Sequence, residues 1–326
     1  MLNRLYIVIG VLAILILGAA FIVPRLVPWG NYRDRMEALA AQALGGDVRI
    51  KGDIKFALLP QPHLSLTDVS VGPAANPAMA VKSVDADFSL IDFLRDRYTM
   101  TKLTLDHPVL DVKIGAGGQV ETGLKLNGAD GKANLSVANA RIAVGTVRVT
   151  DARSGRDYAL EGIDGDLTLS ALNGPFGFVG GGSVGDQHYS FHVSTQAIDA
   201  KGNTQMSLFA KPDSGAFSIN LDGALGTGAV PHFAGDLSYR QSPRGPKDPN
   251  GVVGDLTFTS KVDATPEKIA LGGYTLIPDE NRAVTRLTGT ATITLGKTPS
   301  FTAQVAGRRA GLAAARCDSR ARAAAL

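Results

Sequence analysis

Residues 48–58 read VRIKGDIKFAL, and this stretch indicates which kind of fold the chain builds. Its apolar residues Val48, Ile50, Ile54 and Phe56 alternate with charged or small neighbours, which is a hydrophobic period of two. Successive side chains of a β-strand point to opposite faces of the sheet. The period therefore predicts a strand with one apolar face and one solvated face.

The same alternation recurs through most of the remaining sequence. It appears at residues 84–90, 103–105, 110–114, 167–169, 189–193, 217–221, 256–258, 287–295 and 301–305. Clusters of Gly, Asn and Asp separate the runs, as expected for turns, and this template gives about 16–20 strands. The phase of the alternation slips at His107 and Pro108, which predicts a bulge or a strand break there.

So many strands with one apolar face leave two architectures open. The chain is predicted to be mainly β. Its strands form either one long curved antiparallel sheet, a β-groove, or a two-sheet sandwich. Both architectures place one face of every strand away from water, so the periodicity does not separate them.

Two helices are predicted before the first strand. Residues 5–23 carry no charged side chain, and a helix of this length covers about 28 Å, close to the roughly 30 Å hydrocarbon core of a bilayer. We expect an uncleaved transmembrane anchor, and the alternative is a signal peptide that is cut before Phe21. Asn31 is a good N-cap, and residues 31–44 are predicted to form a short amphipathic helix.

These patterns divide the chain into three parts. Residues 1–29 are the expected cytoplasmic stub and anchor, 30–306 the β domain with a polar loop or linker at 241–250, and 307–326 a separate tail. The tail contains 8 Ala and 5 Arg and shows no alternation. We expect a shifted reading frame to have produced it, with a native basic tail as the alternative. The strand near Phe301 is then predicted to be an uncovered edge.

The composition argues against several classes of function. Lys and Arg total 33 and Asp and Glu total 30, so the net charge is +3 and nothing indicates the clustered basic face of a nucleic-acid-binding protein. Cys317 is the single cysteine of the chain. An internal disulfide and a Cys-based zinc or iron–sulfur site are therefore excluded.

Three short motifs resemble catalytic or ligand-binding sites but are better explained as structure. Residues 181–185 fit the G-x-S-x-G pattern, yet a strand-like run follows Ser183 where a nucleophile elbow requires a helix. Residues 296–298, GKT, lack the earlier glycine of a phosphate-binding loop. His188 and His192 would lie about 13 Å apart on a strand, too far to share a metal ion.

Two pairs of carboxylates, Asp85 with Asp87 and Asp164 with Asp166, each fall on one face of a predicted strand. Calcium binding would need further oxygen ligands that the sequence does not place, so a solvated face is the better interpretation. No set of catalytic residues remains. We expect a protein that is not an enzyme and that has no cofactor and no metal site.

Several segments, in this order, resemble the AsmA-like family of bacterial envelope proteins. They are the N-terminal anchor, the short helix ending at 44–45, residues 48–54, residues 59–71, the helical turn at 90–97, the strand pair with its proline at 102–111, and the Gly-rich turn at 117–118. The resemblance covers residues 1 to about 120 and is looser from there to 305. The C-terminal part of longer family members has no counterpart here.

The resemblance implies a single-pass protein of the bacterial inner membrane with its bulk in the periplasm. It also implies a role in outer-membrane biogenesis, through lipid transport in a β-groove or through protein targeting to, or assembly in, the membrane. Phospholipid or another envelope lipid, and outer-membrane assembly proteins, are the implied partners. The alternative is a structural envelope scaffold that binds protein partners through sheet edges.

If the sheet forms a groove, the apolar residues of its first strands are the candidates to line it. These lipid-groove candidates are Val48, Ile50, Ile54, Phe56, Val84, Phe88, Leu103 and Leu105.

Overall fold

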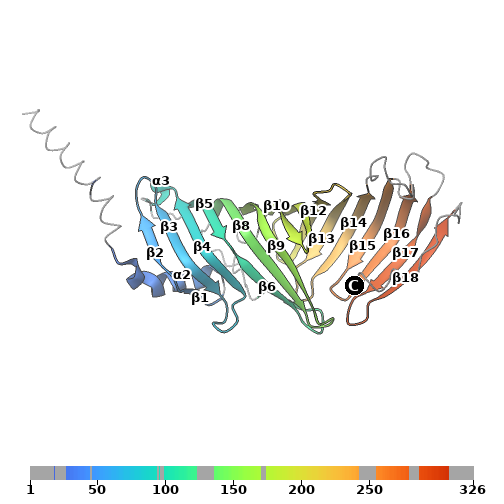
Figure 1. The fold of residues 1–326 in the computed structure, drawn as a ribbon, viewed down its shortest axis with the longest axis horizontal. Helices are drawn as coiled ribbons and strands as arrows, with labels where there is room; N and C mark the ends of the chain where they lie inside the picture. Colours follow the sequence, from blue (N-terminus) through green and yellow to red (C-terminus); the bar gives the residue numbers. More distant parts are fainter. Residues whose placement is uncertain are drawn as a thin grey trace, which may run out of the picture.

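The structure is a computed structural model, and it describes residues 18, 27–44, 46–93, 95, 99–122, 136–169, 174–241, 255–278 and 286–307. Within these residues the chain forms one sheet of 18 strands, which follow one another along the sheet in nearly chain order (Figure 1). The strands are not divided between two stacked sheets. Of the two predicted architectures, the single long sheet is the one found.

The helices and strands have the following bounds. The described helical elements are η1 (Trp29–Tyr32), α2 (Arg33–Leu44) and α3 (Leu90–Phe93). The first strands are β1 (Val48–Ile50), β2 (Ile54–Ala57), β3 (His63–Val71), β4 (Met79–Phe88), β5 (Thr99–Asp106), β6 (Val109–Ile114), β7 (Val120–Glu121), β8 (Ser136–Asp151) and β9 (Arg156–Leu169). The later strands are β10 (Phe176–Val184), β11 (Gln187–Thr195), β12 (Asn203–Pro212), β13 (Phe217–Gly226), β14 (His232–Gln241), β15 (Leu256–Ala264), β16 (Lys268–Pro278), β17 (Leu287–Thr294) and β18 (Ser300–Gly307).

The predicted helix at 31–44 is present, with a different start. α2 begins at Arg33, and Asn31, the predicted N-cap, lies inside the 3-10 helix η1, where its N–H donates to the Pro28 carbonyl at 3.1 Å. The predicted anchor at 5–23 lies outside the described residues except for Gly18. Among the helices that are described, none is both long enough and apolar enough to cross a membrane.

The sheet is mixed, which corrects the prediction of an antiparallel one. β8 runs parallel to both β5 and β6, with Leu103 opposite Ala140 and Leu110 opposite Val147. The other strand pairs in the described chain are antiparallel. Side chains alternate with a period of two in both kinds of pair, so the sequence pattern carries no information about strand direction.

The predicted strand break at His107 and Pro108 is confirmed. β5 ends just before His107, whose φ is 49°, and β6 begins just after Pro108, which has no N–H to donate. The His107 N–H donates to the Ala143 carbonyl at 2.8 Å, and the Thr146 N–H donates to the Pro108 carbonyl at 2.7 Å. Both residues of the break are therefore hydrogen-bonded through their backbone to β8.

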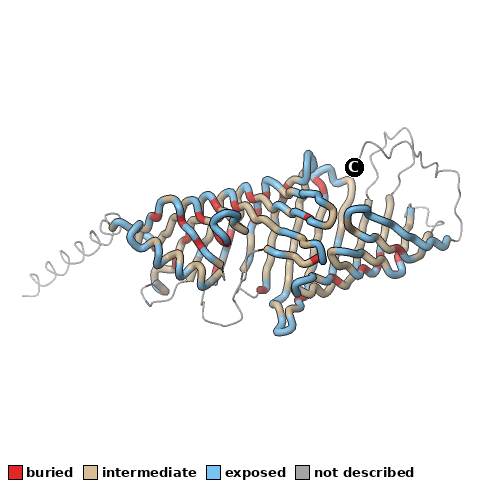
Figure 2. Tube along the Cα trace, turned by 90° about the horizontal axis from the view of Figure 1, so that it is seen from below, coloured by how far each residue is buried: buried red, intermediate tan, exposed pale blue. Residues whose placement is uncertain are grey.

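A closed core lies at the N-terminal end of the sheet. Its buried members are Val48, Ile50, Ile54, Val69 and Val71. They pack against partly buried residues from η1 and α2, namely Trp29, Met36, Ala40, Ala41 and Leu44, and from the neighbouring strands, namely Leu64, Leu66, Met79 and Val84. Farther along the sheet, the buried residues form small separate patches instead of one central block (Figure 2).

The sheet curls, and two contacts between distant turns show it. The Arg153 guanidinium, in the β8–β9 turn, donates to the carbonyl of Pro266 in the β15–β16 turn, although β10 to β14 lie between them in the sheet. The Val120 N–H of β7 donates to the carbonyl of Ala229, in the β13–β14 turn, at 2.9 Å. A flat sheet would hold these turns far apart.

Candidate functional site

The cross-strand register joins the apolar residues of successive strands into continuous rows. Directly opposite residues of two paired strands point to the same face of the sheet. One row runs from β9 to β14 through Leu167, Phe178, Val193, Leu208, Leu221 and Leu237. The next row runs from β11 to β17 through Phe191, Ala210, Ile219, Tyr239, Phe258, Leu276 and Leu287. We call the face that carries these uncharged rows the apolar face.

The apolar face is only half covered. Leu208, Leu221 and Leu237 are half-buried, whereas their neighbours Ser207 and Asp222, on the opposite face, are exposed. Beyond β1 and β2, no described helix packs extensively on the sheet. A contiguous apolar surface that its own chain covers only partly is a candidate binding surface.

The eight predicted groove residues fall into two groups. Val48, Ile50 and Ile54 are buried, with at most 9% exposure, in the closed core beneath η1 and α2. Phe88 is equally buried, and the ring of Phe56 meets Trp29 of η1 edge-on, with 5.0 Å between centroids.

The other three, Val84, Leu103 and Leu105, are half-buried, and the register places Leu105 beside Val84. The open part of the face therefore lies mostly in later strands. None of the eight candidates lies in those later strands, although the later strands carry the same period of two.

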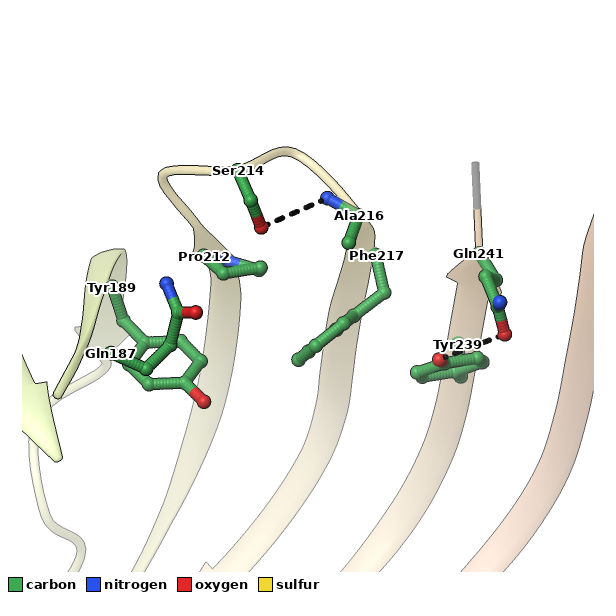
Figure 3. Close-up of a pocket in the computed structure, with 8 residues that line it drawn as sticks. All are labelled: Gln187, Tyr189, Pro212, Ser214, Ala216, Phe217, Tyr239 and Gln241. Carbon is green, nitrogen blue, oxygen red and sulfur yellow. Dashed lines mark hydrogen bonds between the residues drawn. The ribbon is translucent and has the colours of Figure 1, made fainter. Parts of the chain in front are cut away.

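A cavity of about 360 Å³ lies beside the second row, at one end of strands β11 to β14 (Figure 3). Its lining contains no charged residue and consists of Gln187, Tyr189, Pro212, Ser214, Ala216, Phe217, Tyr239 and Gln241. Tyr189 lies opposite Pro212. Phe191 of the second row is two positions farther along β11, and residues two apart on a strand point to the same face. The cavity therefore continues the apolar face.

Aromatic rings form the floor of this cavity. Phe217 stacks on Tyr239 with 5.5 Å between ring centroids and an interplanar angle of 27°, and Tyr189 lies 6.4 Å from Phe217 on the other side. The Tyr239 hydroxyl donates to the Gln241 amide oxygen at 3.4 Å. The cavity thus combines flat apolar surfaces with uncharged hydrogen-bonding groups at the end of the strands.

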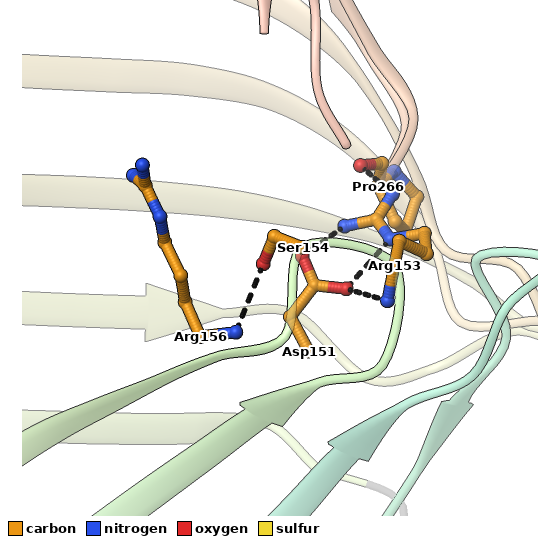
Figure 4. Close-up of polar contacts among 5 residues, drawn as sticks. All are labelled: Asp151, Arg153, Ser154, Arg156 and Pro266. Atoms are coloured by element: carbon orange, nitrogen blue, oxygen red, sulfur yellow. Dashed lines mark hydrogen bonds and ion pairs between the residues drawn. The ribbon is translucent and has the colours of Figure 1, made fainter. Parts of the chain in front are cut away.

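The turn between β8 and β9 carries the most buried ion pair among the described residues (Figure 4). Arg153 Nε lies 2.8 Å from Asp151 Oδ1, Arg153 Nη2 lies 2.9 Å from Asp151 Oδ2, and the two side chains are only 10% and 9% exposed. These hydrogen bonds from Arg153 lower the pKa of Asp151 from 3.8 to about 2, and they raise the pKa of Arg153. Since Arg153 also bonds Pro266, the pair links the β8–β9 turn to the β15–β16 turn across the curl of the sheet.

Exposed ion pairs cover the opposite, polar face. Arg141 Nη2 lies 2.5 Å from Asp164 and Nη1 lies 3.5 Å from Asp166. His63 likewise lies 3.7 Å from Asp85 and 2.7 Å from Asp87. Each of the two predicted carboxylate pairs therefore contacts a basic side chain. In the described part of the chain, no group of acidic, His or Cys residues is arranged to hold a metal ion.

The remaining motifs lie in hairpins. Ser183 is near the end of β10, directly opposite His188 of β11, so no helix follows it and the geometry of a nucleophile elbow is missing. Lys297, of the GKT motif, lies in the turn between β17 and β18. His188 and His192 both lie on β11, as predicted.

Comparison with known proteins gives one match. The model of the AsmA family matches residues 1–164, half of the chain. No curated protein and no solved structure matches the chain significantly.

Proposed function

The chain belongs to the AsmA family, and on this premise we propose that it binds lipid acyl chains on its apolar face during biogenesis of the outer membrane. Phospholipid is the proposed cargo, and the role needs no catalytic step. We also propose that the chain is held in the bacterial inner membrane by residues 5–23, with the sheet in the periplasm, where outer-membrane assembly proteins would be its protein partners.

One observation carries the lipid proposal: apolar rows cross at least six consecutive strands without a charged residue and are only partly buried. Each CH₂ group that leaves water for such a surface contributes about 0.8 kcal/mol. A lipid tail that lies across several strands would gain several such increments. A small polar ligand would gain little from the same surface.

The dimensions of the sheet suit a long ligand. β1 and β2 share one position beside β3, and β5 and β6 share another beside β8, so the sheet is about 15 strands wide. At about 4.8 Å per strand this is roughly 70 Å, several times the length of one acyl chain. The uncharged cavity at Tyr189 and Phe217 would receive the polar end of the lipid, through the amides of Gln187 and Gln241.

Photo-crosslinking tests the proposal directly. A benzophenone amino acid replaces Leu208, Leu221 or Leu237 on the apolar face, or Ser207 or Asp222 on the opposite face of the same strands. In membranes that contain radiolabelled phospholipid, irradiation should label the first three variants and leave the last two unlabelled. Equal labelling of both faces, or none on the apolar face of a folded protein, would contradict the proposal.

A further inference from the structure

The two ends of the sheet differ in how their backbone is covered. At the N-terminal end, the Ile50 N–H donates to the Glu37 carboxylate at 2.7 Å. Arg33 donates to the Gly52 carbonyl at 2.8 Å. Side chains of α2 thus occupy backbone groups at Ile50 and Gly52 that this edge would otherwise offer to another strand.

At the other end, no described residue covers the outer side of β18. It pairs with β17 alone among the described strands, and all eight of its residues are exposed, including Phe301 at 68% and Val305 at 62%. Its sequence, SFTAQVAG, contains no charged residue and no proline. Natural edge strands usually carry such residues to prevent pairing, so this edge lacks the ordinary protection.

The orientation of the backbone in β18 follows from Gln304. Its carbonyl accepts the Tyr274 hydroxyl at 3.1 Å, and a Cβ added to Gly289 of β17 would collide with it, so this carbonyl points back toward β17. Backbone groups of successive residues point alternately to the two sides of a strand. Phe301, Ala303 and Val305 therefore present their N–H and C=O groups to the open edge. Their side chains continue the apolar face, because Phe301 lies opposite Ile293 and Ala303 opposite Ala291.

We propose that β18 pairs with β18 of a second copy of this chain, antiparallel and about a two-fold axis at Ala303. Opposite residues must point to the same face, so an axis perpendicular to the sheet has to pass between two identical residues. Placing it at Ala303 gives nearly full overlap of the strands and sets Phe301 opposite Val305 of the partner. The three outward-facing positions then form about six backbone hydrogen bonds, two in each pair.

The two-fold symmetry limits the assembly to two copies, because the pairing uses the β18 edge of both chains. A filament would have to grow through the other end of the sheet, where Glu37 and Arg33 already bond backbone groups at Ile50 and Gly52. The two-fold pair keeps both apolar faces on the same side, so they join into one surface across the interface. The proposal does not depend on which ligand that surface binds.

Sedimentation of the full chain in detergent tests the pairing. We expect dimers at micromolar concentration. Ala303→Pro removes an outward N–H that β17 does not use, so it should weaken dimerisation at least about tenfold while the fold persists. Ala303→Lys sets two ammonium groups opposite each other on an unaltered backbone and should act likewise. A wild-type protein that stays monomeric at high concentration, or open-ended oligomers, would overturn the proposal.

Cysteine crosslinking tests the register, in a chain whose single cysteine is removed by Cys317→Ser. With the axis at Ala303, the two Ala303 Cα atoms are about 5.5 Å apart, within the range of a disulfide, so Ala303→Cys should crosslink under mild oxidation. The two Thr302 Cα atoms would be about 8 Å apart, and Thr302→Cys is the matched control that should not crosslink. Equal crosslinking at both positions would refute this register.

Discussion

Arg153 joins two turns that lie far apart in the sequence. It pairs with Asp151 in its own turn and bonds Pro266, which is 113 residues away. A buried ion pair gains little against apolar alternatives, but removing one partner leaves the other charge unpaired in a poorly hydrated place. We therefore expect Arg153 to contribute more to stability than the exposed arginines do.

We expect Arg153→Ala to lower the free energy of unfolding by about 2–4 kcal/mol, because Asp151 loses its partner and the β15–β16 turn is released. Chemical denaturation, followed by circular dichroism, measures the change. Arg156→Ala is the control, since Arg156, the first residue of β9, is exposed just after the same turn (Figure 4). Equal effects of the two substitutions would show that the Arg153 contacts do not stabilise the fold.

The same pair predicts a pH dependence. Asp151 has a folded pKa of about 2 against the ordinary 3.8. Since the folded value is the lower one, its stabilisation of about 2 kcal/mol is complete above the ordinary pKa and is lost as the pH falls from about 4 to 2. Unfolding of the wild type and of Asp151→Asn, measured across this interval, should show a steeper fall for the wild type. Parallel curves would be inconsistent with a depressed pKa.

At the scale of single elements, β13 shows how an open face differs from a closed core. Leu221 of β13 is half-buried on the apolar face, whereas Ile50 of β1 is only 2% exposed beneath α2. A charge at Leu221 can reach water, but a charge at Ile50 cannot. Ile54 and Phe88 are buried, as Ile50 is. A charge introduced at either position would therefore report on folding and not on ligand binding.

We expect Leu221→Asp to cost less than about 2 kcal/mol of unfolding free energy while it abolishes co-purification of phospholipid. Ile50→Asp should cost at least about 4 kcal/mol. Native mass spectrometry reports the bound lipid and denaturation reports the stability. Asn220→Asp adds the same charge to the exposed face of β13 and should alter neither. Unfolding by Leu221→Asp to the same degree as by Ile50→Asp would mean that the apolar face is a closed core.

At the scale of the whole molecule, the link to the membrane remains a prediction. If residues 5–23 form an uncleaved anchor, the full chain should stay in the pellet after carbonate extraction of bacterial membranes, and deletion of 1–29 should release it. N-terminal sequencing of the mature protein distinguishes the alternative. Recovery of a soluble chain that begins near Phe21 would show a cleaved signal peptide instead.

The tail at 308–326 lies outside the described residues, so its expected origin in a shifted reading frame also remains a prediction. The strand before it agrees with the prediction of an uncovered edge, because β18 is exposed throughout. Hydrogen exchange across 308–323 provides the measurement. Fast exchange is expected, and slow exchange would show that the tail pairs with the sheet.

The sequence by itself determined the strands and the side of each strand that avoids water, because the alternation of residues such as Val48, Ile50, Ile54 and Phe56 is a local property of an extended chain. The sequence also determined the break at His107 and Pro108, since proline restricts the backbone of its immediate neighbours. Only the tertiary structure decided that the strands form one sheet, that β8 runs parallel to β5 and β6, and that Arg153 reaches Pro266. Each of these depends on which distant segments meet, and a period of two is compatible with many such pairings. The same reason explains why Val48 and Ile50 of β1 are buried beneath α2 while Leu221 of β13 remains partly exposed: the alternation is alike in both strands, and only the placement of the helix distinguishes them.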